Sequence, residues 1–463
     1  MVEVVVVGGG PAGLAAAYRL TRRPGHAVTV LERAPTPGGL AAGFRHGPYI
    51  LDYGPHRLHP AIDPEVLADL RALLGAELQA RPRHGRIFLG GRYLTYPLGP
   101  STLLQVGPRR AIAFGGGLLA ARLTPVAEKL ASYEEALRAR LGSPLYEQFY
   151  GPYAEKVWGL PGSRIAADQA ELRVNQRGVL DLLRLVAGRA NSGCYLYPEG
   201  GFGRIPGVYA DRLHDTPSAR VLCSATVDVV RWSPGRVDAL GYAHEGRAVE
   251  MRPDHVVWTA PIADLVRRLD PPAPPDVRQA LERLRYRALV LAYVVLAVPR
   301  VGSADTYYFP ERRFPFNRVT EQKNFSPALV PPERTVLCLD ITCDPGDAVH
   351  RASDEAIARL VLPALEEAGL ARPEWVVEVF TRRFAQAYPR YEIGYREALQ
   401  TAMDWLAGLE NLWLIGRQGR FLHNNTHHAL LMGYRAADVI ASGGDRATWA
   451  AATAEFHTFR VAD

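Results

Sequence analysis

The 463-residue sequence contains little cysteine. Its four cysteines, Cys194, Cys223, Cys338 and Cys343, are scattered and form no CxxC pair. This usage argues against a disulfide framework and against a structural zinc site, and it indicates a reducing compartment. We therefore expect a cytoplasmic protein with no bound metal.

Long apolar runs are also missing. The longest, residues 288–298, is about half a membrane span, and no basic region precedes the apolar stretch at the N-terminus. We expect neither a transmembrane segment nor a signal peptide. The net charge of +6 is dispersed along the chain rather than gathered into tracts, so nucleic acid is not an expected partner. The length suffices for two or three packed units.

Lysine is the scarcest charged residue. Only Lys129, Lys156 and Lys323 are lysines, and the other cations among the 54 basic residues are arginines. A surface cation in this chain is normally arginine. Lys156 and Lys323 are therefore either lysines that occur by chance or residues with a role specific to lysine.

The strongest signal lies in the first forty residues. Four consecutive valines at 4–7 predict a buried parallel strand, and Gly8, Gly10 and Gly13 then form GxGxxG at the start of an apolar helix. These glycines permit a tight turn, close approach of a pyrophosphate and packing of helix on strand. Glu32 ends the second strand, 28–31, where a carboxylate accepts ribose hydroxyls. An ordinary glycine-rich turn is the simpler alternative.

A second glycine pair follows Glu32 in the string ERAPTPGGL. This extension resembles the flavoprotein superfamily of amine oxidases, protoporphyrinogen oxidases, phytoene desaturases and UDP-galactopyranose mutases. In those families the extra glycines pass close to the diphosphate and the flavin, so the resemblance implies FAD as the cofactor. The cofactor-binding residues implied in this region are Gly8, Gly10, Pro11, Ala12, Gly13, Glu32, Arg33, Gly38, Gly39 and Leu40.

The order of the remaining segments predicts an α/β protein built on a discontinuous Rossmann-type FAD-binding domain. We expect this domain to comprise residues 1–60, 195–265 and 405–463. Residues 61–194 are expected to form a mainly helical substrate or cap domain, and residues 266–404 a mixed-sheet substrate domain. No second nucleotide site is predicted, because the GxGxxA string at 115–120 follows no strand.

The superfamily resemblance also implies cofactor contacts later in the chain. The backbone near Val227 would face the adenine, and the helix expected at 426–442 would begin under the flavin pyrimidine ring. Its N-terminal dipole would stabilise negative charge there, and Gly433 would permit close approach of another group. The cofactor-binding residues implied outside the first forty are His56, Val227, Gly416, His428, Met432 and Gly433.

The string GPHRLH presents His56 and His59 after a turn. Two histidines three residues apart could bind a metal, but no carboxylate or cysteine stands at a useful spacing. The string resembles the substrate-side flavin loop of UDP-galactopyranose mutases, where a histidine lies against the isoalloxazine. Loop histidines that only bond to backbone are the alternative.

Further strings follow the order seen in eukaryotic-type mutases, namely PYAEKVWG, YYFP, PFNRVT, NFSP, AYP and GRQGRF. In that family a tyrosine of the YFP string and the arginine of the RxT string hold the substrate diphosphate. The resemblance implies catalytic roles for His56, Tyr308, Arg318 and Arg417. It implies substrate contacts for Tyr96, Trp158, Arg173, Tyr388, Asn424 and Asn425.

The chain departs from the mutase pattern at the nucleotide and sugar ends. Gly99 and Pro100 replace a glutamine that would meet the uracil, and His423 stands where a tyrosine is expected. Thr426 and His427 replace a Gln-Asp pair. These positions bear on the identity of the base and sugar more than on the flavin.

Two reactions therefore remain open for a small-molecule substrate. The first is a mutase-type ring change on a nucleotide-diphosphate sugar with no net redox change, which arginine forks and tyrosine hydroxyls would suit. The second is an oxidase, dehydrogenase or desaturase that passes hydride from an organic substrate to FAD. In that case Lys323 would poise a water near the flavin, by analogy with amine oxidases.

Overall fold

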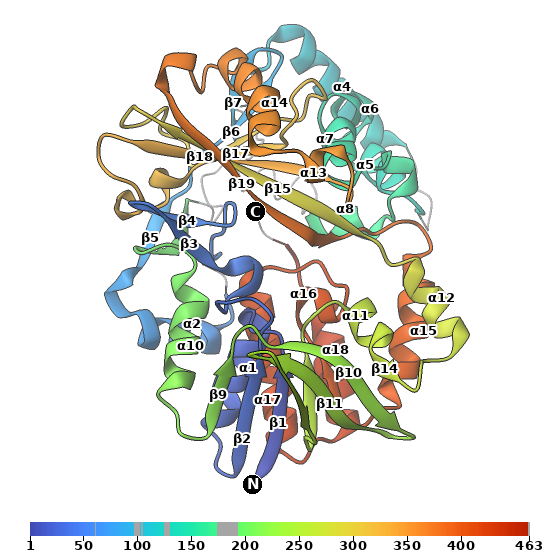
Figure 1. Cartoon of the computed structure of the whole chain (residues 1–463). Helices are drawn as coiled ribbons and strands as arrows, with labels where there is room; N and C mark the ends of the chain where they lie inside the picture. The colour runs from blue at the N-terminus through green and yellow to red at the C-terminus, as the bar shows by residue number, and fades with distance from the viewer. Residues whose placement is uncertain (61, 97–101, 103–104, 125–129, 174–192, 462–463) are drawn as a thin grey trace.

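The computed structural model describes residues 1–60, 62–96, 102, 105–124, 130–173 and 193–461, with only the backbone of 171–173 (Figure 1). Its lower part is built on a parallel sheet in the order β20-β13-β1-β2-β9. The four valines at 4–7 of β1 are buried on both faces of this sheet, as predicted. The strands are β1 (Val2–Val7), β2 (His26–Leu31), β9 (Ala219–Leu222), β13 (His255–Trp258) and β20 (Leu412–Leu414).

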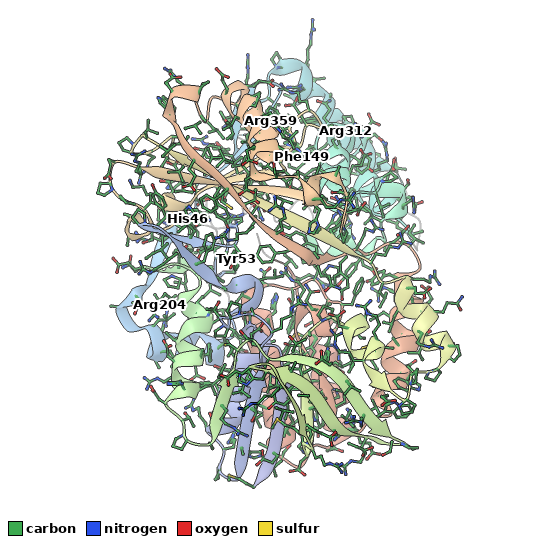
Figure 2. All side chains as sticks on the ribbon, viewed as in Figure 1. His46, Tyr53, Phe149, Arg204, Arg312 and Arg359 are labelled. Atoms are coloured by element: carbon green, nitrogen blue, oxygen red, sulfur yellow. The ribbon has the colours of Figure 1, made fainter. Side chains whose placement is uncertain are left out.

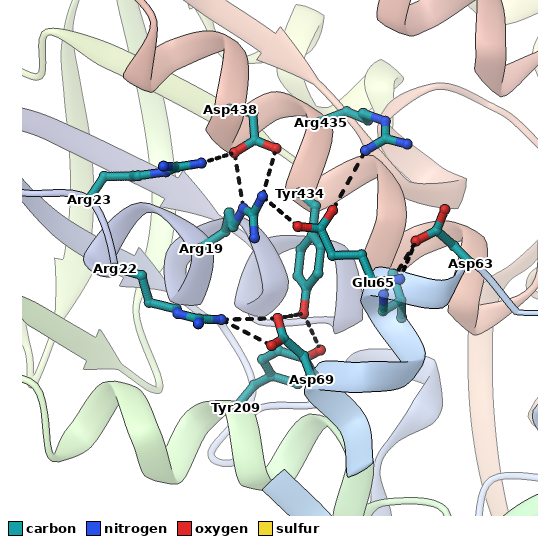
Figure 3. Close-up of polar contacts among 11 residues, drawn as sticks. Arg19, Arg22, Arg23, Asp63, Glu65, Asp69, Tyr209, Tyr434, Arg435 and Asp438 are labelled. Atoms are coloured by element: carbon teal, nitrogen blue, oxygen red, sulfur yellow. Dashed lines mark hydrogen bonds and ion pairs between the residues drawn. The ribbon is translucent and has the colours of Figure 1, made fainter. Parts of the chain in front are cut away.

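Five helices pack together on this parallel sheet and against one another. Figure 3 shows polar contacts that join them: Tyr434 donates to Asp69 at 2.8 Å and shares a second hydrogen bond of 2.8 Å with Tyr209. Arg19 pairs with Asp438 at 3.0 Å. These contacts fix the helices that surround the glycine turn. The helices are α1 (Pro11–Thr21), α2 (Pro64–Leu74), α10 (Arg204–His214), α17 (Thr426–Ala441) and α18 (Arg446–Phe456).

A four-stranded sheet in the order β12-β11-β10-β14 lies beside the parallel sheet. Its strands are β10 (Thr226–Ser233), β11 (Arg236–His244), β12 (Arg247–Met251) and β14 (Leu269–Asp270). The helices that pack nearby are α11 (Ile262–Arg267), α12 (Pro275–Glu282), α15 (Tyr395–Ala407) and the short α16 (Gly416–Gly419).

The upper part is built on a seven-stranded sheet in the order β19-β15-β18-β17-β16-β6-β7. All eleven residues of β15 are buried. Two strands of this sheet come from the region expected to be mainly helical. The strands are β6 (Gly85–Leu89), β7 (Arg92–Tyr96), β15 (Tyr286–Leu296), β16 (Thr306–Tyr308), β17 (Arg318–Glu321), β18 (Thr335–Cys343) and β19 (Val376–Pro389).

Helices cover the upper sheet, among them α14 (Asp354–Glu367), which buries Ile357, Val361 and Leu365. The helices formed by residues 108–173 lie to the right of α14 in Figure 1. Among the helices described, none is both long and apolar enough to cross a membrane. The remaining helices are α4 (Pro108–Leu123), α5 (Tyr133–Leu141), α6 (Ser143–Leu145), α7 (Gly151–Trp158), α8 (Asp168–Arg173) and α13 (Ala348–Arg351).

Two small sheets connect the upper and lower parts: β3 (Gly43–His46) pairs with β4 (Tyr49–Asp52), and β5 (Leu78–Pro82) pairs with β8 (Cys194–Pro198). His46 and Tyr53 lie at this junction (Figure 2), where His46 stacks on Phe380 of β19 at 3.9 Å. Asp52 forms hydrogen bonds to both the lower and the upper part of the molecule. Its carboxylate accepts the N–H of Phe202 at 2.9 Å, and its carbonyl accepts the hydroxyl of Tyr293 at 2.7 Å.

Candidate active site

The glycine turn between β1 and α1 has the geometry that a dinucleotide requires. Gly8 has φ +104°, and a Cβ there would lie 2.2 Å from Thr259 Oγ1. A Cβ on Gly13 would lie 2.1 Å from the carbonyl oxygen of Gly8, so helix and strand pack at a distance that only glycine allows. A Cβ on Gly10 would meet nothing within 4 Å. The backbone at Gly10 is thus open beside the N-terminus of α1, as a pyrophosphate needs.

Glu32 and the second glycine pair complete this cradle. The buried carboxylate of Glu32 accepts the N–H of Gly9 at 2.7 Å and that of Ala34 at 2.7 Å. Gly38 N–H donates to the carbonyl of Gly9 at 2.7 Å, and a Cβ on Gly39 would lie 3.2 Å from Gly10 Cα. The two glycine segments are therefore in contact, and this donor set fits the diphosphate and ribose of FAD. Leu40 lies in the turn that follows, and the side chain of Arg33 is exposed.

The C-terminal segment converges on the same turn. Gly416 has φ +78°, and its Cβ would lie 3.2 Å from Cβ of Ala12. A Cβ on Gly433 of α17 would lie 2.4 Å from the carbonyl oxygen of Ala12. The group that approaches Gly433 closely is thus the backbone of helix α1. Gly433 contributes to this site by allowing α17 to pack against α1. The fully buried Met432 accepts a hydrogen bond through Sδ from Asn424 at 3.2 Å.

The polar residues at the start of α17 form hydrogen bonds that cap the N-terminus of this helix. His428 Nδ1 accepts the N–H of Asn425 at 3.2 Å, and its ring stacks on Phe459 at 4.4 Å. Burial lowers the pKa of His428 to about 4, with the charge of His59 adding to the effect. In the neighbouring sheet, the carbonyl of Val227 accepts a hydrogen bond from Arg268 Nε at 2.7 Å.

His56 is a partly buried, neutral imidazole beside two arginines. Its ring stacks on Phe202 with centroids 5.1 Å apart. Burial, together with the charges of Arg417 and Arg318, lowers the pKa of His56 to about 3. The structure therefore brings together three of the four residues for which catalytic roles were implied. The positive charge around His56 comes from these arginines rather than from the imidazole itself.

The fourth such residue, Tyr308, shares a sheet face with Arg318. Tyr308 on β16 pairs with Arg318 on β17, which pairs with Asp340 on β18, so the three side chains point to one side. Arg318 Nε donates to Asp340 Oδ2 at 2.9 Å. Burial lowers the pKa of Arg318, but the carboxylate of Asp340 and the nearby hydroxyls of Tyr388, Tyr153 and Tyr308 together outweigh burial and raise it well above its ordinary value. Arg318 is thus a permanent cation.

An aromatic wall adjoins the arginines. Trp158 of α7 meets Tyr388 edge-on at 6.1 Å and His423 at 5.6 Å, and Tyr388 stacks on His423 at 5.9 Å. The guanidinium of Arg417 lies 5.8 Å from the centre of the Tyr388 ring and donates to the carbonyl of Asn424. The segment PYAEKVWGLP begins within α7, and the last residue of that helix, Trp158, forms part of the wall.

Arg57 is a site residue that the sequence did not reveal. Its Nη2 donates to the Tyr308 hydroxyl at 3.2 Å, and its Nη1 lies 3.6 Å from the buried carboxylate of Asp305. Because Arg57 supplies a proton to the Tyr308 oxygen, the hydroxyl proton of Tyr308 can point toward a ligand. Tyr96 lies against Tyr308 with ring centres 4.6 Å apart. In a chain this rich in arginine, Arg57 carried no signal of its own.

Lys156 and Lys323 both donate hydrogen bonds to backbone carbonyls. Lys156 donates to the carbonyls of Phe309 at 2.6 Å and Phe316 at 2.6 Å, which ties α7 to the loop after β16. Lys323 lies within 3.1 Å of four carbonyl oxygens, those of Pro299, Pro331, Pro332 and Arg334. An ammonium suits such cages because it is a compact charge with three donors. The expectation that Lys323 poises a water near the flavin is therefore wrong.

Two expected features fall wholly or partly outside the described residues. Arg173 ends α8, but only its backbone is described. Gly99 and Pro100, which replace the uracil-side glutamine, lie outside the described residues.

Comparison with known proteins bears on the whole chain. Residues 11–441 match the family model described as flavin containing amine oxidoreductase. A structure of reduced UDP-galactopyranose mutase superposes with a TM-score of 0.83 at 19% identity, covering 100% of this chain and 98% of that one. A protein from Exiguobacterium sp. 255-15, provisionally named a protoporphyrinogen oxidase, gives a TM-score of 0.72 at 18% identity, covering 95% and 98%.

An amine-binding structure is also similar. Wild-type putrescine oxidase bound to putrescine gives a TM-score of 0.63 at 19% identity, covering 95% of this chain and 99% of that one. At these identities the three structures establish a shared fold.

Proposed function

The chain belongs to the family of flavin containing amine oxidoreductases, and from this premise we propose that it uses reduced FAD to change the ring size of a nucleotide-diphosphate sugar. FAD is its cofactor, in line with the family and with the paired glycine segments around Gly9 and Gly38. The reaction would resemble that of the UDP-galactopyranose mutases. The base and the sugar are left open, because the residues expected to meet them differ from the mutase pattern.

The observation that carries the proposal is the positive charge around a neutral His56. Arg318 and Arg417 both lower the pKa of this imidazole, so both lie close enough to act on it. Positive charge in a partly buried site attracts a diphosphate and repels an ammonium ion. A protonated amine substrate would have to overcome that repulsion, so the site favours an anion over an amine.

The side chains divide the work of binding and orientation. Arg318, held by Asp340, and Arg417, held by the Asn424 carbonyl, would bind phosphate oxygens. Tyr308 would add a hydroxyl donor, oriented by Arg57. These groups would also stabilise the charge that develops on a departing diphosphate.

The cofactor would supply the covalent chemistry. Reduced FAD provides a nucleophilic ring nitrogen, so the protein needs no acid–base pair of its own for that step. The N-terminus of α17 would favour the negative charge of the reduced ring. Trp158 and Tyr388 would exclude water from the reacting carbon.

Hydride transfer from an organic substrate to FAD is the second candidate. The aromatic wall of Trp158, Tyr388 and His423 supports it, because such a wall would also hold an uncharged organic molecule. The positive charge of Arg318 and Arg417 disfavours a protonated amine as the substrate of such a reaction.

The two candidates differ in what happens to the flavin. The purified holoenzyme should convert a nucleotide-diphosphate sugar, tested first with UDP-galactopyranose, only after reduction by dithionite under anaerobic conditions. Chromatography of the products and flavin absorbance would show many turnovers without reoxidation. Steady oxygen uptake, or flavin bleaching when an amine or another organic substrate is added to the oxidised enzyme, would instead establish the oxidase.

A further inference from the structure

Helix α4 exposes an apolar stripe to solvent. Ile112, Leu119 and Leu123 are 76%, 59% and 77% exposed, and all three belong to this one helix. With 3.6 residues per turn, these three side chains and Gly116 fall on a single face. Among the described residues only eight large hydrophobic side chains are exposed, so three on one helix face form an unusual concentration.

The opposite face of α4 is firmly packed. Phe114 is buried in a cluster with Phe149 and Tyr308, and Arg110 Nε donates to Gln148 at 3.1 Å. A Cβ on Gly117 would lie 2.8 Å from Cδ of Pro144, so the helix rests closely on α6. The fold thus presents the exposed stripe on a fixed helix. Figure 1 places α4 at the upper edge of the molecule, at the end opposite β1 and β2.

The charge on α4 has one sign. The helix contains Arg109, Arg110 and Arg122 and no Asp or Glu. Arg110 is used on the packed face, whereas Arg109 and Arg122 are exposed and flank the apolar stripe on either side. An exposed apolar stripe bordered by arginine is the pattern of a helix that lies in the plane of a membrane interface.

We propose that α4 docks this protein on the surface of a phospholipid bilayer that carries anionic headgroups. Ile112, Leu119 and Leu123 enter the boundary between headgroups and acyl chains, while Arg109 and Arg122 bind the lipid phosphates. Ile112 and Leu123 are eleven residues apart, or about 16 Å along the axis, so the helix lies parallel to the surface. With only three large apolar side chains, the attachment is reversible.

The same features disfavour a second copy of the chain as the occupant. Two facing α4 helices would bring four exposed arginines together with no acidic residue of either helix between them. A stable dimer also needs about 800 Å² from each partner, which one short stripe interrupted by Gly115–Gly117 does not supply. An anionic bilayer satisfies both the apolar and the basic groups.

Vesicle sedimentation with the holoenzyme tests this proposal. We expect binding to vesicles containing 30% phosphatidylglycerol, with weak binding to pure phosphatidylcholine. Arg109→Gln with Arg122→Gln should reduce partitioning roughly 30-fold at low salt, since each basic residue near an anionic surface is worth about fivefold. The triple variant Ile112→Ser, Leu119→Ser, Leu123→Ser should reduce it at least tenfold.

A matched control uses exposed apolar residues elsewhere. Leu360 and Val377 are 42% and 51% exposed on α14 and β19, and Leu360→Ser with Val377→Ser should leave partitioning within twofold. Bound FAD and the melting temperature report whether each variant is folded. Equal vesicle binding by the triple variant would overturn the proposal. So would a dimer, seen by light scattering, that the triple variant abolishes.

Discussion

The guanidinium of Arg318 and the carboxylate of Asp340 face each other across β17 and β18, with Nε and Oδ2 2.9 Å apart. Asp340 is fully buried, and its other oxygen, Oδ1, has no hydrogen-bond partner among the described residues. The pair therefore fixes the position of Arg318 from one side. The remaining donors of the guanidinium are available to an anion on the other side.

Replacing Arg318 by lysine should weaken binding of a diphosphate substrate. Lysine keeps the charge but loses the planar fork that can meet both Asp340 and a phosphate oxygen. A lost charge-assisted hydrogen bond is worth about 1.5–3 kcal/mol, so KM should rise about 10- to 100-fold, with a smaller fall in kcat. Steady-state kinetics would check this. Arg312→Lys, at an exposed arginine paired with Glu155, is the matched control and should change neither constant.

His56 should remain neutral across the working pH range. Burial and the two arginines lower its pKa to about 3, so its protonation does not change between pH 5 and 8. The profile of kcat/KM against pH should accordingly show no inflection near 6.5 that is due to His56. The profile of the His56→Gln variant should therefore have the same shape as that of the wild type. An inflection of that kind would mean that the imidazole is better solvated than the structure indicates.

Gly433→Ala should loosen the packing of α17 on α1. The new methyl group would lie 2.4 Å from the Ala12 carbonyl oxygen and 2.8 Å from the Ala16 nitrogen. Both are backbone atoms that cannot turn aside, so we expect a loss of about 1–3 kcal/mol in stability and weaker FAD retention. Thermal unfolding and flavin release measure these effects.

Gly116→Ala is the matched control for that substitution. Gly116 is also a helical glycine, but a Cβ there would meet nothing within 4 Å. It should stabilise the protein by about 0.5–1 kcal/mol, because alanine favours the helix. If both substitutions behaved alike, the close contact between α1 and α17 would be in doubt.

The sequence predicted the parallel sheet and the glycine turn because both depend on local patterns. Runs of valine and the spacing of Gly8, Gly10 and Gly13 carry their own geometry. The resemblance located His56, Arg318 and Arg417, which the structure brings together. Arg57 and Asp340 escaped notice because a partner on another strand gives each its role, and spacing along the chain does not encode such pairing. Lys323 was misplaced for the same reason, since its four carbonyls come from Pro299 and from the segment 331–334.

Lys323→Met should reduce stability without changing the chemistry of the folded enzyme. Methionine has a similar length but no donor, so the four carbonyls around Lys323 Nζ would lose their shared partner. A hydrogen bond to a charged group is worth about 1.5–3 kcal/mol. The unfolding midpoint in urea should fall clearly, while kcat per bound FAD should stay within about twofold. A large loss of kcat at full FAD occupancy would restore a role for this lysine near the flavin.

Asp52 should make stability depend on pH in the direction opposite to that of most carboxylates. Burial raises its pKa from 3.8 to about 6, although the hydroxyl of Tyr197 and the N–H groups of Phe202 and Gly203 oppose that effect. The folded protein therefore holds the Asp52 proton more tightly than the unfolded chain does, and stability falls as the pH rises from about 4 to 6. At about 1.36 kcal/mol per unit, this amounts to roughly 3 kcal/mol.

Asp52→Asn removes this titration, so the stability of the wild type relative to the variant should decline over that interval and stay constant above pH 7. Urea unfolding at pH 4.5, 6 and 7.5 measures the difference. Asp445→Asn provides the opposite case, because the hydroxyl of Thr448 lowers the pKa of Asp445 at the start of α18. The stabilising effect of the Asp445 carboxylate should be lost as the pH falls and the carboxylate is protonated. A wild type that gains stability over Asp52→Asn between pH 4.5 and 6 would show that the hydrogen bonds to Asp52 outweigh its burial.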